Sequence, residues 1–167
     1  MIYFDSESDM ESAIFQSMND GECLPWNTSP HRVIKAERQV KLGEYGIADI
    51  VAYVECMESG ETWVEVVELK NTKLRADHLS QLARYKGFFD DSEFDCARFT
   101  LVGLKTFPSG GDECYLFQSA EWADVYELTI CMIEGVSFEK VSGWRPAKNG
   151  EKCDKFVARF TEKKAED

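Results

Sequence analysis

The sequence predicts an α/β (α+β) fold: a mixed central β-sheet flanked by helices, with a β-rich extension at the C-terminal end. Two observations predict it. A helical pattern opens the chain and is followed by three strand-like segments, and a second helix then leads into another buried strand. At 167 residues and 44% hydrophobic side chains, the chain can bury one real core. We therefore expect a single domain over 1–167, with its core at about 8–105 and the extension at about 106–167.

The first part of the chain is predicted to be a helix followed by strands. Residues 8–19 carry Ile14, Phe15 and Met18 at helical spacing. Strands are predicted for 32–41, where apolar and polar residues alternate in part, and for 46–55 and 62–70, which are rich in β-branched and aromatic residues. The polar turn between the last two predicts an antiparallel hairpin.

The second part begins with the clearest helix of the sequence, 75–89. Its residues Leu79, Leu82 and Phe89 form an apolar stripe. The segment 97–105 is expected to be a buried strand. Four further elements are expected after it: strands at 114–118, 128–133 and 156–160, and a short helix at 120–127.

Composition excludes several classes of protein. No apolar run is long enough to cross a bilayer, and the acidic N-terminus has no secretory signal pattern, so we expect a cytoplasmic protein with no membrane partner. None of the six cysteines stands in a CxxC or CxH pair. That spacing argues against a zinc knuckle or an iron–sulfur cluster. Six cysteines could form disulfides in a secreted protein, but nothing in the sequence implies secretion, so we expect reduced, mostly buried thiols.

The net charge of −12 opposes the binding of a polyanion, yet the basic residues are not spread evenly. The first 30 residues contain acidic but no basic side chains. Residues 69–88 contain five basic side chains against the single acid Asp77, and 31–43 contain four against Glu37. We interpret this as a local phosphate-binding track on an otherwise acidic body.

One group of residues carries candidate chemistry. Asp49 is the only charged residue in the apolar run GIADIVAY, and the next strand ends in Glu68-Leu69-Lys70. Side chains alternate along a strand, so Glu68 and Lys70 share a face that a neighbouring strand can bring close to Asp49. Two carboxylates, with the Leu69 carbonyl as an additional ligand, suit Mg²⁺ or Mn²⁺, and Lys70 suits positioning or deprotonating a water beside the metal.

This pattern resembles the PD-(D/E)XK nuclease superfamily, and within it the RecB-like branch. The motifs that carry the resemblance are GIAD ending at Asp49, ELK over Glu68 to Lys70, and Gln81 with Tyr85 four residues apart on the following helix. The match covers roughly residues 8–105, and Ala48 stands where the name-giving pattern has proline. The resemblance implies a restriction-endonuclease-like core.

It also implies a metal-dependent nuclease that hydrolyses phosphodiester bonds, with DNA favoured as the nucleic-acid partner and a homodimer or larger complex possible. The expected catalytic residues are Asp49, Glu68, Lys70, Gln81, Tyr85 and Glu11. The expected ligands of Mg²⁺ (or Mn²⁺) are Asp49, Glu68, Leu69 and Glu11, and the expected nucleic-acid contacts are Lys73, Arg75 and Arg84.

Several alternatives remain beside these expectations. Ser8-x-x-Glu11 also fits a capping box, in which Glu11 only closes the start of its helix, and Glu37 would be the substitute ligand. His78 is expected to be a solvated helix residue. For the whole chain, the alternative is a catalytically silent, acidic nucleic-acid mimic or regulatory protein that binds a basic partner.

Overall fold

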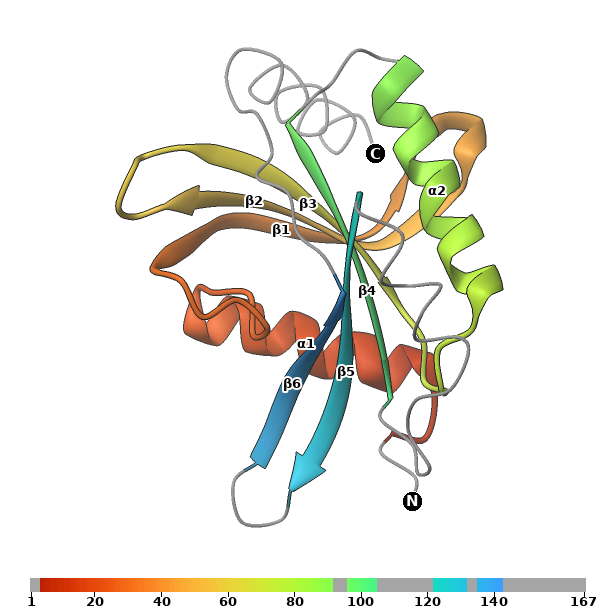
Figure 1. Ribbon diagram of the computed structural model, residues 1–167. Helices are drawn as coiled ribbons and strands as arrows, with labels where there is room; N and C mark the ends of the chain where they lie inside the picture. The colour runs from red at the N-terminus through yellow and green to blue at the C-terminus, as the bar shows by residue number, and fades with distance from the viewer. Residues whose placement is uncertain (1–3, 92–95, 105–121, 132–134, 143–167) are drawn as a thin grey trace.

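The computed structural model describes residues 4–91, 96–104, 122–131 and 135–142, which form one six-stranded sheet and two helices (Figure 1). Along the chain the elements are α1 (Glu7–Gly21), β1 (His31–Lys41), the 3₁₀ turn η1 (Gly43–Tyr45), β2 (Ile47–Cys56), β3 (Thr62–Leu69), α2 (Ala76–Asp91), β4 (Ala97–Leu104), β5 (Ala123–Cys131) and β6 (Gly135–Ser142).

The strands lie in the order β1-β2-β3-β4-β5-β6. β1, β2 and β3 form an antiparallel meander, β3, β4 and β5 run parallel, and β6 returns antiparallel to β5. Parallel neighbours need a crossover connection, and α2 supplies it between β3 and β4. The sheet is therefore mixed, and the predicted hairpin of β2 and β3 is confirmed.

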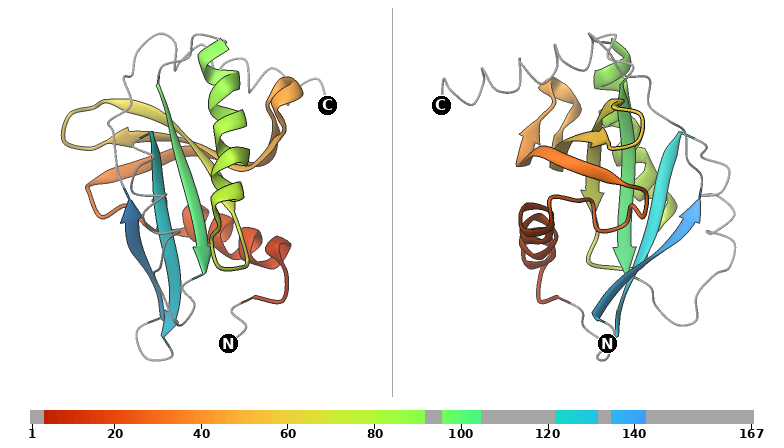
Figure 2. Two further views of the ribbon diagram at one scale, coloured as in Figure 1. Left: turned by 45° about the vertical axis from the view of Figure 1, so that its right-hand side comes forward. Right: turned by 90° about the vertical axis from the view of Figure 1, so that its left-hand side faces the viewer.

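The two helices cover opposite faces of the sheet (Figure 2). On one face, Met10, Ile14 and Met18 of α1 pack in a buried cluster with alternate side chains of β2, β3 and β4. On the other face, Leu82, Tyr85 and Phe89 of α2 pack with the remaining alternate side chains. Because both faces are covered, the central strands are buried on both sides, which is why β3 carries so little polar surface.

The two helices and the four strands predicted between residues 8 and 105 are confirmed, within one or two residues at their ends. The helix predicted at 120–127 is wrong, because residues 123–131 form β5 in parallel register with β4. Pairing in the sheet overrides the local helix preference of this segment. β6 was not predicted as a strand, and the strands expected at 114–118 and 156–160 lie outside the described residues.

The expectation that the cysteines are reduced is only partly met. Cys23 and Cys56 are free, whereas Cys96 is disulfide-bonded. The prediction rested on the absence of a secretory pattern, and the sequence does not reveal which cysteines the fold brings within bonding distance. Within the described part of the chain, neither helix has the length and apolar character to cross a membrane.

Candidate active site

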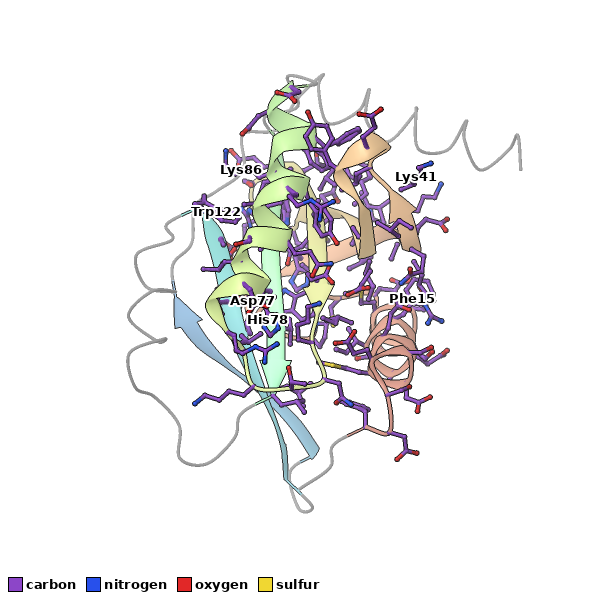
Figure 3. The ribbon with its side chains drawn as sticks, turned by 90° about the vertical axis from the view of Figure 1, so that its right-hand side faces the viewer. Phe15, Lys41, Asp77, His78, Lys86 and Trp122 are labelled. Carbon is purple, nitrogen blue, oxygen red and sulfur yellow. The ribbon has the colours of Figure 1, made fainter. Side chains whose placement is uncertain are left out.

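The site forms where β2 and β3 part. The last register pair of these strands is Ile50 with Val67. One step further along the antiparallel pair, Asp49 and Glu68 stand opposite each other beyond the end of the ladder. The strands that carry them run between α1, marked by Phe15, and α2, marked by His78 (Figure 3). The two carboxyl groups therefore lie beside each other at the end of the β2–β3 ladder, between the two helices (Figure 3).

Asp49 is held through both of its carboxyl oxygens. Oδ2 accepts a hydrogen bond from the backbone N–H of Leu69 at 2.8 Å, and Oδ1 lies 3.4 Å from the side-chain nitrogen of Gln39. Burial raises the pKa of Asp49, and the Leu69 amide opposes part of that rise. The carboxyl group is thus positioned by the backbone of the strand that carries Glu68.

Glu68 is more deeply buried, with 3% of its surface exposed. Oε2 lies 2.7 Å from the hydroxyl of Tyr85, and Oε1 lies 3.6 Å from Nζ of Lys70. Burial and the charge of Asp49 raise the pKa of Glu68 to about 8, although the Tyr85 hydroxyl and the Lys70 ammonium act in the opposite direction. At neutral pH the pair therefore tends to hold one proton between two carboxyl groups.

Gln81 and Tyr85 reach the site from α2, as their four-residue spacing predicted. The side-chain amide of Gln81 donates to the Tyr85 hydroxyl at 3.1 Å, and this hydroxyl also lies 2.8 Å from the carbonyl oxygen of Ile47. Burial and the neighbouring Glu68 raise the pKa of Tyr85, so the phenol stays protonated and keeps a proton to donate. Tyr85 thereby links α2 to Glu68 and to the start of β2.

Glu11 lies on α1, and side chains of β1 bind its carboxylate. Arg38 donates to its Oε2 from two guanidinium nitrogens, at 2.7 and 3.2 Å, and Gln39 donates to Oε1 at 2.5 Å. The capping-box alternative is wrong, since Ser6 caps α1 by accepting from the Asp9 amide. Glu11 instead joins α1 to β1.

The predicted nucleic-acid contacts lie at the surface. Lys73, Arg75 and Arg84 are all exposed, and Nε of Arg75 lies 3.5 Å from a carboxyl oxygen of Asp77. His78 was expected to be solvated and is instead buried, with 6% of its surface exposed. Its Nδ1 accepts from the backbone N–H of Arg75, so the ring closes the start of α2.

Arg38 and Gln39 are the site neighbours that sequence reasoning missed. From the sequence, Arg38 is one of the basic residues of 31–43, and Gln39 is an ordinary polar residue of a predicted strand. The available signal was the break in alternation, because two polar residues stand side by side just before the buried Val40. That signal indicates an irregularity in the strand, but it does not show that Gln39 contacts Glu11 and Asp49.

The side chains present fit a divalent metal ion. Asp49 and Glu68 offer carboxylate oxygens, the ligands that Mg²⁺ and Mn²⁺ take, and burial raises the pKa of both groups because it removes water from the charged form. Over residues 4–91, 96–104, 122–131 and 135–142, no group of three His, Cys, Asp or Glu side chains is arranged to hold a metal. Two carboxylates would be supplemented by the Leu69 carbonyl, water and substrate phosphate.

Comparison with known proteins bears on the fold. No family model and no curated protein matches the chain. A solved structure that resembles it is the crystal structure of a repair endonuclease from Pyrococcus abyssi, with a TM-score of 0.50 and 24% sequence identity. The likeness covers 75% of this chain but 48% of that chain, so this chain spans about half the length of the protein it resembles. The chain has a restriction-endonuclease-like core, with a mixed sheet flanked by helices.

Proposed function

We propose that this chain is a metal-dependent nuclease of the PD-(D/E)XK type, of the RecB-like branch, that hydrolyses phosphodiester bonds and favours DNA. The observation that carries the proposal is the buried Asp49–Glu68 pair at the end of the β2–β3 ladder, with Lys70 and Tyr85 directly on Glu68. Resemblance in fold to a repair endonuclease supports it.

Each residue has a role that follows from its contacts. Asp49 and Glu68 would hold Mg²⁺ or Mn²⁺, which when bound polarises a phosphodiester oxygen and lowers the pKa of water. Lys70 positions the attacking water and stabilises the negative charge that develops on the phosphate. Tyr85 donates to Glu68 and fixes its direction, and Gln81 fixes Tyr85.

The exposed basic residues would bind the substrate backbone. Lys73, Arg75 and Arg84 lie in or just before the helix that carries Gln81 and Tyr85. Lysine and arginine side chains can bind phosphates even when the net charge of the protein is negative. Such contacts make the affinity for nucleic acid fall as the salt concentration rises. This arrangement reconciles a net charge of −12 with a nucleic-acid substrate.

The first experiment tests cleavage directly. Labelled single-stranded, duplex and branched DNA, and RNA, are incubated with the protein and Mg²⁺ or Mn²⁺. We expect Lys70→Ala and Asp49→Asn to abolish cleavage without unfolding the protein, because both act at the reacting centre. The matched control is Asp90→Asn, which breaks an exposed ion pair with Lys86 near the end of α2 and should cleave normally. Equal activity in wild type and both site variants would refute the assignment.

The acidic binder remains the rival function, since the net charge favours a basic partner. Calorimetry separates the two. Binding of Mn²⁺ that is lost in Asp49→Asn supports the nuclease. Absence of metal binding, with tight capture of a basic protein that survives Asp49→Asn, supports the binder.

A further inference from the structure

Gln39 has a backbone conformation that strands rarely contain. Its φ is +51°, and Glu22 is the other non-glycine residue of the described chain with a positive φ. The register runs on without a shift from Arg38 paired with Ile50 to Val40 paired with Ala48, so Gln39 lies opposite Asp49. A left-handed residue other than glycine costs free energy, and such residues gather at functional sites.

The effect of this conformation is visible in the side chains. Neighbouring residues of a regular strand point to opposite faces. Arg38 and Gln39 nevertheless both donate to the carboxylate of Glu11. The positive φ at Gln39 turns its side chain toward the α1 face of the sheet, which Phe15 marks in Figure 3. Cζ of Arg38 lies on the same face, 5.7 Å from the centroid of the Phe15 ring.

The Gln39 amide therefore stands between two carboxylates. Its nitrogen lies 2.5 Å from Oε1 of Glu11 and 3.4 Å from Oδ1 of Asp49. An amide nitrogen carries two hydrogens, so one can serve each carboxylate. Glu11 raises the pKa of Asp49 by its charge, and the amide lies between these two like charges.

We propose that Gln39 is a positioning residue for Asp49, anchored by the Glu11–Arg38 ion pair, and that it fixes the carboxyl group from the side opposite the Leu69 amide. With Oδ2 held by Leu69 and Oδ1 restrained by Gln39, Asp49 has one orientation toward Glu68. Glu11 then acts through Gln39 rather than as a metal ligand. The catalytic consequence rests on the proposed nuclease function, but the positioning itself does not.

Substitution by glycine makes a clean test. Gln39→Gly removes the amide and relaxes the left-handed backbone, so the fold should be retained. Glu22→Gly makes the same backbone change at an exposed residue at the end of α1, and it serves as the control. Gln39→Asn tolerates the same backbone but is one methylene too short to bridge the carboxylates. It gives a second variant should the glycine form fail to fold.

Two measurements are made on each variant. The first is hydrogen exchange of the Leu69 amide in metal-free protein, which reports whether Asp49 still accepts from it. The second is the Mg²⁺ or Mn²⁺ concentration for half-maximal cleavage. We expect both Gln39 variants to exchange the Leu69 amide about tenfold faster. They should also need about 10- to 100-fold more metal, as loss of a supporting hydrogen bond to a ligand does.

The outcomes separate the two proposals. If Gln39→Gly matches Glu22→Gly in exchange and in cleavage while the wild type cleaves, the positioning role is overturned and the nuclease stands. If no form cleaves any substrate, yet Leu69 exchange rises in the Gln39 variants alone, the nuclease fails and the positioning role is supported.

Discussion

Two glutamates of β3 are equally buried but held in opposite ways. Glu65 and Glu68 each expose 3% of their surface. Glu65 accepts hydrogen bonds from Trp26 and Trp63, at 2.7 and 2.9 Å, and from Thr100 at 3.1 Å, and the charge of Arg98 lies nearby. Glu68 has the Tyr85 hydroxyl and the Lys70 ammonium beside it, but it also faces the carboxyl group of Asp49. A structural role explains Glu65, whereas the proposed metal, held by Glu68 and Asp49 together, would offset the cost of burying Glu68.

The raised pKa of Glu68 predicts how stability depends on pH. Between about pH 4.5 and about pH 8, the unfolded chain has lost this proton and the folded protein keeps it. The unfolded state then binds fewer protons, so the free energy of unfolding of the metal-free protein falls as pH rises through this window. Glu68→Gln should flatten the curve and make the protein more stable than wild type above pH 8, by on the order of a few kcal/mol.

Urea unfolding at a series of pH values measures this dependence. Glu61→Gln, at an exposed residue of the β2–β3 turn, provides the control and should follow the wild-type curve. A Glu68→Gln curve that runs parallel to wild type from pH 5 to pH 8 would contradict the raised pKa.

At the scale of elements, the connection from η1 to β2 sets the distance between β2 and α2. Gly46 has φ 121° and ψ −167°, a conformation open almost only to glycine. A Cβ at this position would lie 3.0 Å from Cε1 of Tyr85. The glycine of the GIAD motif therefore has a physical purpose, since it lets Tyr85 approach the carbonyl of Ile47 and reach Glu68.

Gly46→Ala is expected to combine backbone strain with displacement of Tyr85. Gly60→Ala is the matched control, because Gly60 also has a positive φ of 76° but nothing lies within 4 Å of its Cβ position. We expect Gly60→Ala to cost about 1 kcal/mol and to leave cleavage unchanged. Gly46→Ala should cost about 3 kcal/mol and reduce cleavage as well. Denaturant unfolding and the cleavage assay check the pair, and equal effects of the two changes would argue against the Tyr85 contact.

For the whole molecule, the sheet and its helices place a pair of acids at the junction of four elements. Asp49 comes from β2, Glu68 from β3, and the residues that restrain them come from β1 and α2. A cation bound there would join these elements in the folded state alone. Binding would therefore stabilise the entire domain and not only the site.

Thermal unfolding with and without metal tests this linkage. At a Mn²⁺ concentration 100 times the dissociation constant, wild type should gain about 2.7 kcal/mol, which raises Tm by about 5–10 °C. Asp49→Asn should show no shift, and Asp90→Asn should shift as wild type does. An equal rise in Tm in Asp49→Asn would place the metal elsewhere.

The sequence by itself determined the elements of the core and the residues that meet at its centre. Period-two and helical spacing located β2, β3 and α2, and the motif spacing placed Glu68 and Lys70 on one face and Gln81 and Tyr85 on one side of a helix. These features are local, so they can be read from neighbours along the chain. Their chemical roles remain proposals.

Only the tertiary structure decided what depends on contacts between distant residues. Residues 123–127, expected to be helical, form a strand because they pair in parallel with β4. Glu11 is bound by Arg38 and Gln39 of β1. The positive φ of Gln39, the burial of His78 and the disulfide of Cys96 have no local signature. Each is set by packing between elements, where the free energy of many contacts overrides the preference of one segment.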